Sequence, residues 1–204
     1  TGNAKISING TSGVGSTDSY GVGFESSNVA GTTVSSVNGD ITVTGVSTDT
    51  TGQRNSGVRF EDSVGATAFL LNTTGAGNLN VTGTAGNNDP TSFGIQFAED
   101  ALLTLSGTSN TFIADRIEIG ASNVGINAGA NAVSVRQLTN SRSINLGGAD
   151  SATELGLTDA ELDRITAGTI NIGNSNSGLI SVTGVISPAN YQTLSAQNSV
   201  AFTS

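Results

Sequence analysis

Acidic side chains recur at corresponding places in three neighbouring segments, and their type and spacing come closest to supporting chemistry. They are Glu25, Glu61, Asp62, Glu99 and Asp100. If the segments stack as parallel strands, counterpart carboxylates lie roughly 5 Å apart. Stacked carboxylates suit Ca²⁺, and paired carboxylates also serve acid–base cleavage of polysaccharides. The five residues are therefore candidate metal ligands. The alternative, which we favour, is a solvated strand edge whose charge opposes aggregation.

The composition limits the enzymatic alternatives. The chain has no Cys, His, Met or Trp, so it offers neither a thiolate nor an imidazole as nucleophile, base or metal ligand. Its seven cationic residues are scattered and its formal net charge is −9, which argues against binding nucleic-acid phosphates. We predict no catalytic residues, no enzyme activity, no cofactor other than the open case of Ca²⁺, and no nucleic-acid partner. Because apolar runs are short, we expect no membrane span.

Two short patterns recur in phase with a period of about 36 residues, which indicates a repeat architecture. The first pattern occurs at Ile6–Gly10, Ile41–Gly45 and Leu79–Gly83. The second occurs at Gly21–Glu25, Gly57–Glu61 and Gly94–Ala98. Apolar and polar residues alternate within both patterns, which predicts strands with one buried face.

Each of these repeats also contains a third run of strand type. The third runs are Thr32–Val37, Thr67–Leu71 and Leu102–Leu105. Three strands per repeat predict one coil of a parallel β-helix per repeat, although two coils of about 18 residues would fit the same length. Disorder is the alternative that the polar composition raises, and the alternating Val, Ile, Leu and Phe segments argue against it.

Three phenylalanines occupy the same position of the second pattern, namely Phe24, Phe60 and Phe97. They share the parity of neighbouring aliphatic residues, so we predict an internal aromatic ladder. The alternative is an exposed platform on which sugars stack. Tyr20 and Phe93 stand before the same strand and are the better candidates for exposure.

Beyond Ile113 the repeat becomes less regular but continues. The segment Arg116–Gly120 resembles the first strand of a repeat, Val124–Ile126 the second and Ala132–Val135 the third. We predict β-solenoid repeats over residues 1–148. Over residues 149–204 we predict a continuation of the solenoid with a short helix and terminal strands.

The helix is predicted from its start signal. Thr158 and Glu161 have the spacing of a capping box, and Leu157 and Leu162 have the spacing of a hydrophobic staple. We expect a helical insertion of about two turns near residues 158–166, ending before a glycine.

Two phrases, Ser35–Gly45 and Leu155–Gly168, resemble repeats of very large bacterial surface exoproteins. They are similar to β-strand-repeat proteins related to filamentous haemagglutinin-like and autotransporter-like adhesins, and the resemblance covers roughly residues 5–187. It implies a right-handed parallel β-helix, secretion, and a role in adhesion, aggregation or surface fibres. It carries no catalytic residues, and the chain lacks the aspartate-bearing nonapeptides of calcium-binding β-rolls.

The expected molecule is thus an all-β rod, a secreted, non-enzymatic structural or adhesive protein of the cell surface or extracellular matrix. Its expected partners are copies of itself, joined end to end or laterally into extracellular fibres, and surface glycans. The alternative is a polysaccharide-binding or polysaccharide-cleaving β-helix. Because the first repeat begins almost at once, we expect a mature fragment or one module of a longer array. Segments Lys5–Gly10 and Val200–Ser204 lack a polar cap, so we also expect open ends.

Overall fold

The computed structural model describes residues 2–15, 17–26, 33–62, 70–120 and 123–203. Within them the chain is nearly all-β, with 19 strands and one helix of 4 residues. Every strand pairing is parallel. The all-β prediction is confirmed, and the strands form one 11-stranded sheet and two 4-stranded sheets.

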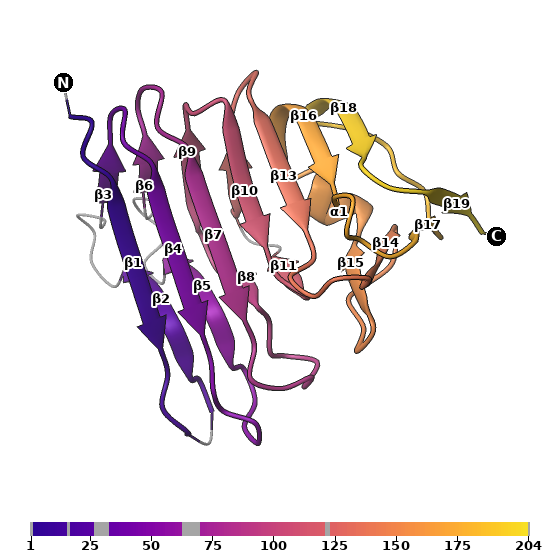
Figure 1. Cartoon of the computed structure of the whole chain (residues 1–204), viewed down its shortest axis with the longest axis horizontal. Coiled ribbons are helices and arrows are strands. Elements are labelled where there is room, and N and C mark those ends of the chain that lie inside the picture. Colours follow the sequence, from indigo (N-terminus) through magenta and orange to yellow (C-terminus); the bar gives the residue numbers. More distant parts are fainter. Residues whose placement is uncertain (1, 16, 27–32, 63–69, 121–122, 204) are drawn as a thin grey trace.

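The largest sheet has two arms that meet at one long strand, β16 (Ile165–Ile172). The arm that faces the viewer in Figure 1 is called the front arm here. Besides β16 it contains β1 (Ile6–Thr11), β4 (Ile41–Val46), β7 (Leu79–Thr84), β10 (Ser109–Ile113), β13 (Ala132–Arg136) and β18 (Tyr191–Ala196). The back arm contains β3 (Thr33–Ser36), β6 (Leu70–Thr73), β9 (Leu102–Leu105) and β12 (Gly125–Asn127), and it also pairs with β16.

The two smaller sheets divide the remaining side of the molecule between them. The side sheet contains β2 (Tyr20–Ser26), β5 (Ser56–Asp62), β8 (Ile95–Phe97) and β11 (Ile117–Ile119). The end sheet contains β14 (Ser143–Leu146), β15 (Glu154–Leu157), β17 (Ile180–Val182) and β19 (Val200–Phe202). The single helix, α1 (Asp159–Leu162), follows β15.

The chain visits the front arm, the side sheet and the back arm in turn, and then returns to the front arm one strand further along. Strands β1 to β3 make the first circuit, and β4 to β6, β7 to β9 and β10 to β12 make the next three (Figure 1). Like residues pair with like, since Ile41 faces Ile6 on one side and Leu79 on the other. One repeat is therefore one circuit of three strands, as predicted. The predicted run Thr67–Leu71 lies largely outside the described residues, as does the start of the run Thr32–Val37.

The strand assignment beyond Ile113 was wrong by one position. Strand β11 pairs with β8 in the side sheet, β12 with β9 in the back arm, and β13 with β10 in the front arm. The first strand of that circuit is β10, whose Phe112 faces Val81 of β7. Only Ala114–Arg116 separate β10 from β11, whereas long loops precede β2, β5 and β8. Because this link is shorter, the strands of the fourth circuit no longer follow the period of about 36 residues that the first three circuits share.

A single hydrophobic core runs from Val22 to Tyr191 between these sheets. Aliphatic residues of neighbouring circuits form its rows; Val43 of β4 and Val81 of β7, for example, face each other and are fully buried. The predicted division at residue 148 falls between β14 and β15, two strands that pair in the end sheet.

The predicted aromatic ladder lies inside this core and is confirmed. The rings of Phe24 and Phe60 are stacked with centroids 5.0 Å apart, and Phe60 and Phe97 with centroids 4.9 Å apart. Each stacked pair contributes about 0.5–1.5 kcal/mol beyond the burial of its area. Tyr20 is half-buried, but the predicted exposure of Phe93 is wrong, because Phe93 is buried beneath the Arg116 guanidinium.

Recurring glycines mark the place where the front arm and the side sheet approach each other. Gly10, Gly45 and Gly83 pair in one row across β1, β4 and β7. A Cβ atom on Gly45 would collide with the carbonyl oxygen of Gly57, and one on Gly83 with that of Gly94. The backbones leave no room for a side chain, which explains why both repeated patterns carry glycine there.

The helix forms at the predicted place but is shorter than predicted. Thr158 is its N-cap, and both hydrogen bonds of the capping box with Glu161 are present. The helix ends at Leu162, whose buried side chain belongs to the core, because Ile165 already begins β16.

Two carboxylates close the outer edge of the side sheet at β11. The N–H of Ile117 donates to Asp150 Oδ2 at 2.9 Å, and the N–H of Ile119 donates to Glu161 Oε1 at 3.3 Å. The guanidinium of Arg164 donates to the Ile119 carbonyl at 2.9 Å. Side chains thus take hydrogen bonds that a further strand would make, and the side sheet is closed at its β11 edge.

Candidate functional site

The outer face of the side sheet holds Glu25 and Glu61, two of the five acidic candidates, and most of their polar neighbours. In β5, Val58 and Phe60 are buried, so the intervening Arg59 and the following Glu61 face outward. In-register pairing places Arg59 beside Gln96 of β8, and Gln96 beside Glu118 of β11. The alternation of each strand thus builds a polar row across this face.

Arg59 is the centre of this row. Its Nε donates to Glu61 Oε2 at 2.9 Å, and its Nη1 donates to the Tyr20 hydroxyl at 3.0 Å and to Gln96 Oε1 at 3.2 Å. The guanidinium also lies over the Tyr20 ring, 5.0 Å from its centroid. Arg59 therefore joins three successive circuits, and its donors are directed at protein partners.

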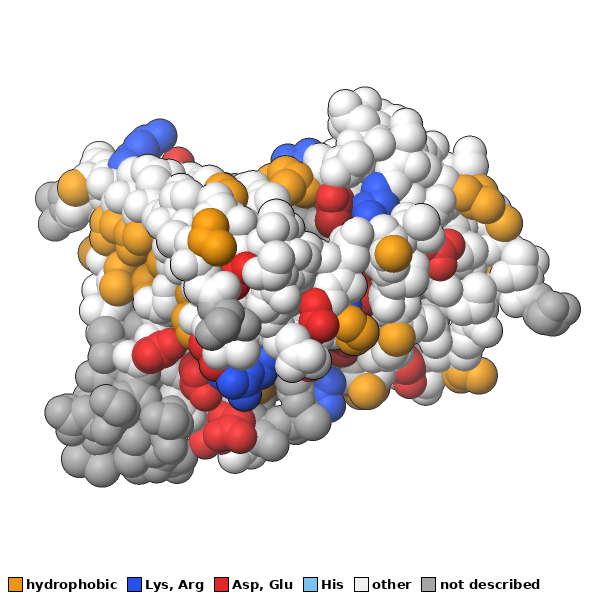
Figure 2. All heavy atoms as spheres, turned by 90° about the horizontal axis from the view of Figure 1, so that it is seen from below, with side chains coloured by type: hydrophobic (Ala, Val, Ile, Leu, Met, Phe, Trp, Pro, Cys, Tyr) orange, Lys and Arg blue, Asp and Glu red, His pale blue; other side chains and the backbone are white. Residues whose placement is uncertain are grey.

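The row continues at both ends. The Tyr20 hydroxyl donates to Asp18 Oδ1 at 2.9 Å, and Gln96 Nε2 donates to Glu118 Oε2 at 2.7 Å. Burial, followed by this hydrogen bond to Asp18, raises the pKa of Tyr20 to about 12. The phenol stays protonated near neutral pH and acts there as a hydrogen-bond donor rather than a base. Figure 2 shows acidic and basic side chains lying close together on one face of the molecule.

The five acidic candidates do not gather at one point. Glu25 pairs in register with Glu61, so these two lie on neighbouring strands of the outer face. Asp62 is buried, with 1% of its surface exposed, and Glu99 and Asp100 lie in the turn after β8. Among the described residues, no group of three or more acidic side chains is placed to hold a metal ion. Of the five, Glu25 and Glu61 are the pair that shares the outer face; the Asp62 side chain is buried, and the Asp62 N–H donates to the Glu99 carbonyl at 2.8 Å.

The chemistry open to that pair follows from its surroundings. Glycoside cleavage needs one carboxylic acid that gives up a proton and one free carboxylate opposite it. Glu61 Oε2 is engaged by Arg59 at 2.9 Å from Nε and 2.7 Å from Nη2. An oxygen held by two donors is well placed to fix an arginine and poorly placed to attack a sugar.

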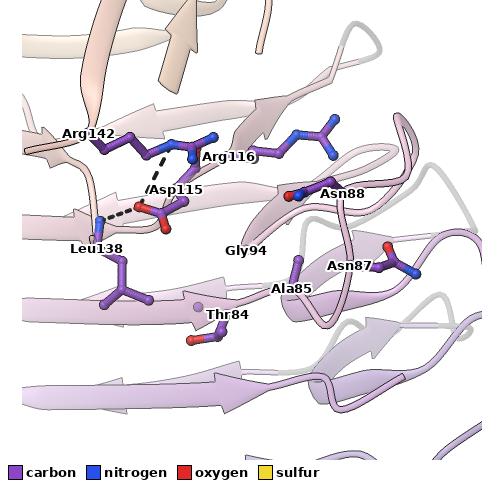
Figure 3. Close-up of a pocket in the computed structure, with 10 residues that line it drawn as sticks. Thr84, Ala85, Asn87, Asn88, Gly94, Asp115, Arg116, Leu138 and Arg142 are labelled. Atoms are coloured by element: carbon purple, nitrogen blue, oxygen red, sulfur yellow. Dashed lines mark hydrogen bonds and ion pairs between the residues drawn. The ribbon is translucent and has the colours of Figure 1, made fainter. Parts of the chain in front are cut away.

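A second polar cluster, around Arg116 and Arg142, was not anticipated from the sequence. Figure 3 shows both side chains beside Asp115 at a cavity of about 80 Å³. Arg116 is only 6% exposed; it donates to the carbonyls of Asp89 and Pro90 and lies 5.0 Å from the centroid of the Phe93 ring.

Arg142 binds the backbone in the same manner. It donates to the carbonyl of Asp115 at 3.0 Å and to those of Ser151 and Ala152 at 2.9 and 3.1 Å. Both arginines therefore tie loops to the sheets. No local spacing could have revealed this, because the partners lie 9 to 27 residues away and are brought near only by the circuits.

No protein-family model, curated protein or solved structure matches this chain. Among the described residues, no helix is both long enough and apolar enough to cross a membrane.

Proposed function

We propose that the chain is a right-handed parallel β-helix that serves as a secreted, non-enzymatic structural or adhesive protein of the cell surface or extracellular matrix. The supporting observation is the in-register parallel pairing that repeats along the front arm from β1 to β18. In such an array each circuit is stabilised by its neighbours, so the length of the molecule increases with the number of repeats. The resemblance of two phrases to bacterial adhesin repeats supports the handedness, the secretion and the surface role.

Self-association through the terminal strands is part of this proposal. Within the described residues, β1 pairs only with β4, and β18 pairs only with β16. The N–H groups of Ile6 and Ser12 donate to the chain of β4, so those of Ser7 and Asn9 point away from it. Unpaired N–H and C=O groups on a parallel edge bind a further strand. Copies of the chain are therefore proposed to associate end to end.

The non-enzymatic role is supported by the engagement of Glu61 with Arg59 and by the absence of His and Cys from the sequence. The alternative is a polysaccharide-cleaving β-helix that uses Glu25 and Glu61. That alternative predicts release of new reducing ends from a polysaccharide, and its loss in Glu25→Gln and Glu61→Gln.

The test of self-association compares the unaltered chain with two variants at one edge residue. Asn9→Pro removes an outward N–H while leaving the ladder with β4 intact, which proline at a sheet edge allows. Asn9→Ala keeps the N–H and is the matched control. By negative-stain microscopy and sedimentation we expect filaments for the unaltered chain and Asn9→Ala, and single particles for Asn9→Pro.

Single particles for all three proteins would refute end-to-end association. Running the same samples with Ca²⁺ and with a chelator tests, in addition, the open case of Ca²⁺ binding. Filaments that form only with Ca²⁺ would support a metal site at the acidic residues, and filaments in both conditions would argue against one.

A further inference from the structure

The front arm differs in charge from the rest of the molecule. Its seven strands contain no Asp or Glu, although the chain has 16 acidic residues, and their single cationic residue is Arg136 at the end of β13. A chain with a formal net charge of −9 thus carries a broad sheet face on which negative charge is missing. A negatively charged partner would meet less repulsion here than elsewhere.

Short hydroxyl and amide side chains form a continuous row across this face. The row is made of register partners in neighbouring strands: Ser7, Thr42, Asn80, Thr111, Ser134, Asn171 and Ser195. At the usual spacing of strands it spans about 29 Å. Within the described part of the chain, Thr42, Asn80, Thr111 and Ser134 make no side-chain hydrogen bond. Their donors and acceptors are directed outward and are available to a polar ligand.

One end of this row is hollowed into a shallow groove of about 550 Å³. Its floor comes from β10, β13 and β16, and its walls come from the turn after β16 and the residue after β18. The lining residues include Thr111, Ser134, Arg136, Asn171, Asn174 and Gln197. Gln197 already donates to Asn171 Oδ1 at 3.3 Å and to Ser195 Oγ at 2.8 Å, which holds that wall in place.

Arg136 differs from the other six cationic residues of the chain. Each of those six contacts a carboxylate or a carbonyl oxygen of the protein: Lys5, Arg54, Arg59, Arg116, Arg142 and Arg164. Within the described residues, the guanidinium of Arg136 has no hydrogen-bond acceptor and no carboxylate in ion-pairing range. It therefore offers a full set of planar donors at the edge of a neutral groove.

We propose that this groove binds a polysaccharide that carries carboxylate groups. The hydroxyl groups of the polysaccharide would form hydrogen bonds with the Ser, Thr and Asn side chains of the row. One of its carboxylates would accept two parallel hydrogen bonds from Arg136. A nucleic acid fits less well, because one cation cannot match a run of phosphates. The inference rests on the adhesive part of the proposed function and is independent of self-association.

The test uses polygalacturonate as the probe, with its fully methyl-esterified form as the neutral control. Calorimetry at low ionic strength should show binding of the charged polymer that weakens with added salt, and weaker binding of the ester. We expect Arg136→Gln to lower the affinity for polygalacturonate about tenfold, as loss of a charged hydrogen-bonding partner does. Arg54→Gln is the matched control, since it removes an exposed cation outside the front arm and should leave the affinity unchanged.

A second variant probes the neutral part of the site. Thr111→Val removes one hydroxyl of the groove floor at constant shape, and we expect a loss of about threefold to tenfold in affinity. Equal effects of Arg136→Gln and Arg54→Gln, or equal binding of the charged and esterified polymers, would overturn the proposal. Filament formation by Arg136→Gln should match that of the unaltered chain, so failure of assembly and failure of glycan binding are separate outcomes.

Discussion

At the scale of single residues, Asp150 takes the place of backbone at the edge of β11. Its two oxygens accept from the N–H groups of Ile117 and Gly156, at 2.9 and 2.8 Å. Burial raises its pKa to about 7, while the two N–H donors and the neighbouring Arg116 oppose the shift and Glu161 adds to it. A carboxyl group that caps a strand is thereby brought to titrate near neutrality.

The raised pKa predicts how stability depends on pH. Unfolded, Asp150 loses its proton near pH 4; folded, it keeps the proton until about pH 7, so between these values the folded state binds more protons. Stability contributed by Asp150 therefore falls as pH rises through this window. Relative to Asp150→Asn, the free energy of unfolding should fall by roughly 2–4 kcal/mol between pH 4 and pH 7.5.

Urea unfolding of both proteins across pH 4 to 9 measures this difference. The difference in free energy of unfolding between the unaltered chain and Asp150→Asn should stop changing above about pH 8, where Asp150 is ionised in both the folded and the unfolded state. A difference that stays constant across the whole range, or that grows with pH, would contradict the assignment.

At the scale of strands, the close approach between the front arm and the side sheet restricts which residues can stand there. A methyl group at Gly45 has no space, because the carbonyl of Gly57 lies where the Cβ would be. Gly13, in contrast, lies in a loop with no atom within 4 Å of a would-be Cβ. The two glycines therefore differ in physical role although both belong to a glycine-rich chain.

Alanine substitutions should separate these two roles. We expect Gly45→Ala to lower the free energy of unfolding by about 2–4 kcal/mol, since the strands must move apart to admit the methyl group. Gly13→Ala should change it by less than about 1 kcal/mol, and with a stabilising sign if the loop backbone is unstrained. Chemical denaturation of both variants checks this; equal losses would show that the packing at Gly45 is not tight.

The first three circuits could be predicted from the sequence because each repeats the same pattern in the same order. Ile41 resembles Ile6 and Leu79 because all three occupy one row of the core. The fourth circuit could not be placed, since the short link before β11 breaks the period.

The polar sites were less predictable than the strands. Recurring acids such as Glu25 and Glu61 were visible as a pattern, but their separation from Asp62 and Glu99 depends on strand parity and on where β8 ends. Arg136 looked like any other cation in the sequence. That its guanidinium has no hydrogen-bond or ion-pair partner within the described part of the chain is apparent only from the folded structure.

At the scale of the whole molecule, one core is shared by circuits that differ in how many neighbours they have. Strand β7 lies between β4 and β10, and its Leu79 and Val81 are fully buried. Strand β1 has one described partner, and its Ile6 and Ile8 are only partly buried. Stability in such arrays depends on nearest neighbours, so protection should rise toward the middle.

Hydrogen exchange under native conditions should report this gradient. We expect backbone amides of β7 that pair within the front arm to exchange at least about 100-fold more slowly than those of β1 that pair with β4. Mass spectrometry of peptides from each strand measures the rates. Equal protection of β1 and β7 would mean that the chain opens as a single unit.

The carboxylate cap on β11 has a mechanical consequence. The long axis of the molecule runs across the strands (Figure 1), so a pull along that axis stretches the ladders between circuits. Among the described residues, no strand of the side sheet follows β11, and side-chain hydrogen bonds of Asp150, Glu161 and Arg164 join this edge to the chain that follows. Three side-chain hydrogen bonds resist extension of the side sheet there in place of a ladder. Under force we expect the molecule to yield first at this level, leaving β1 to β11 stacked on one side of the break.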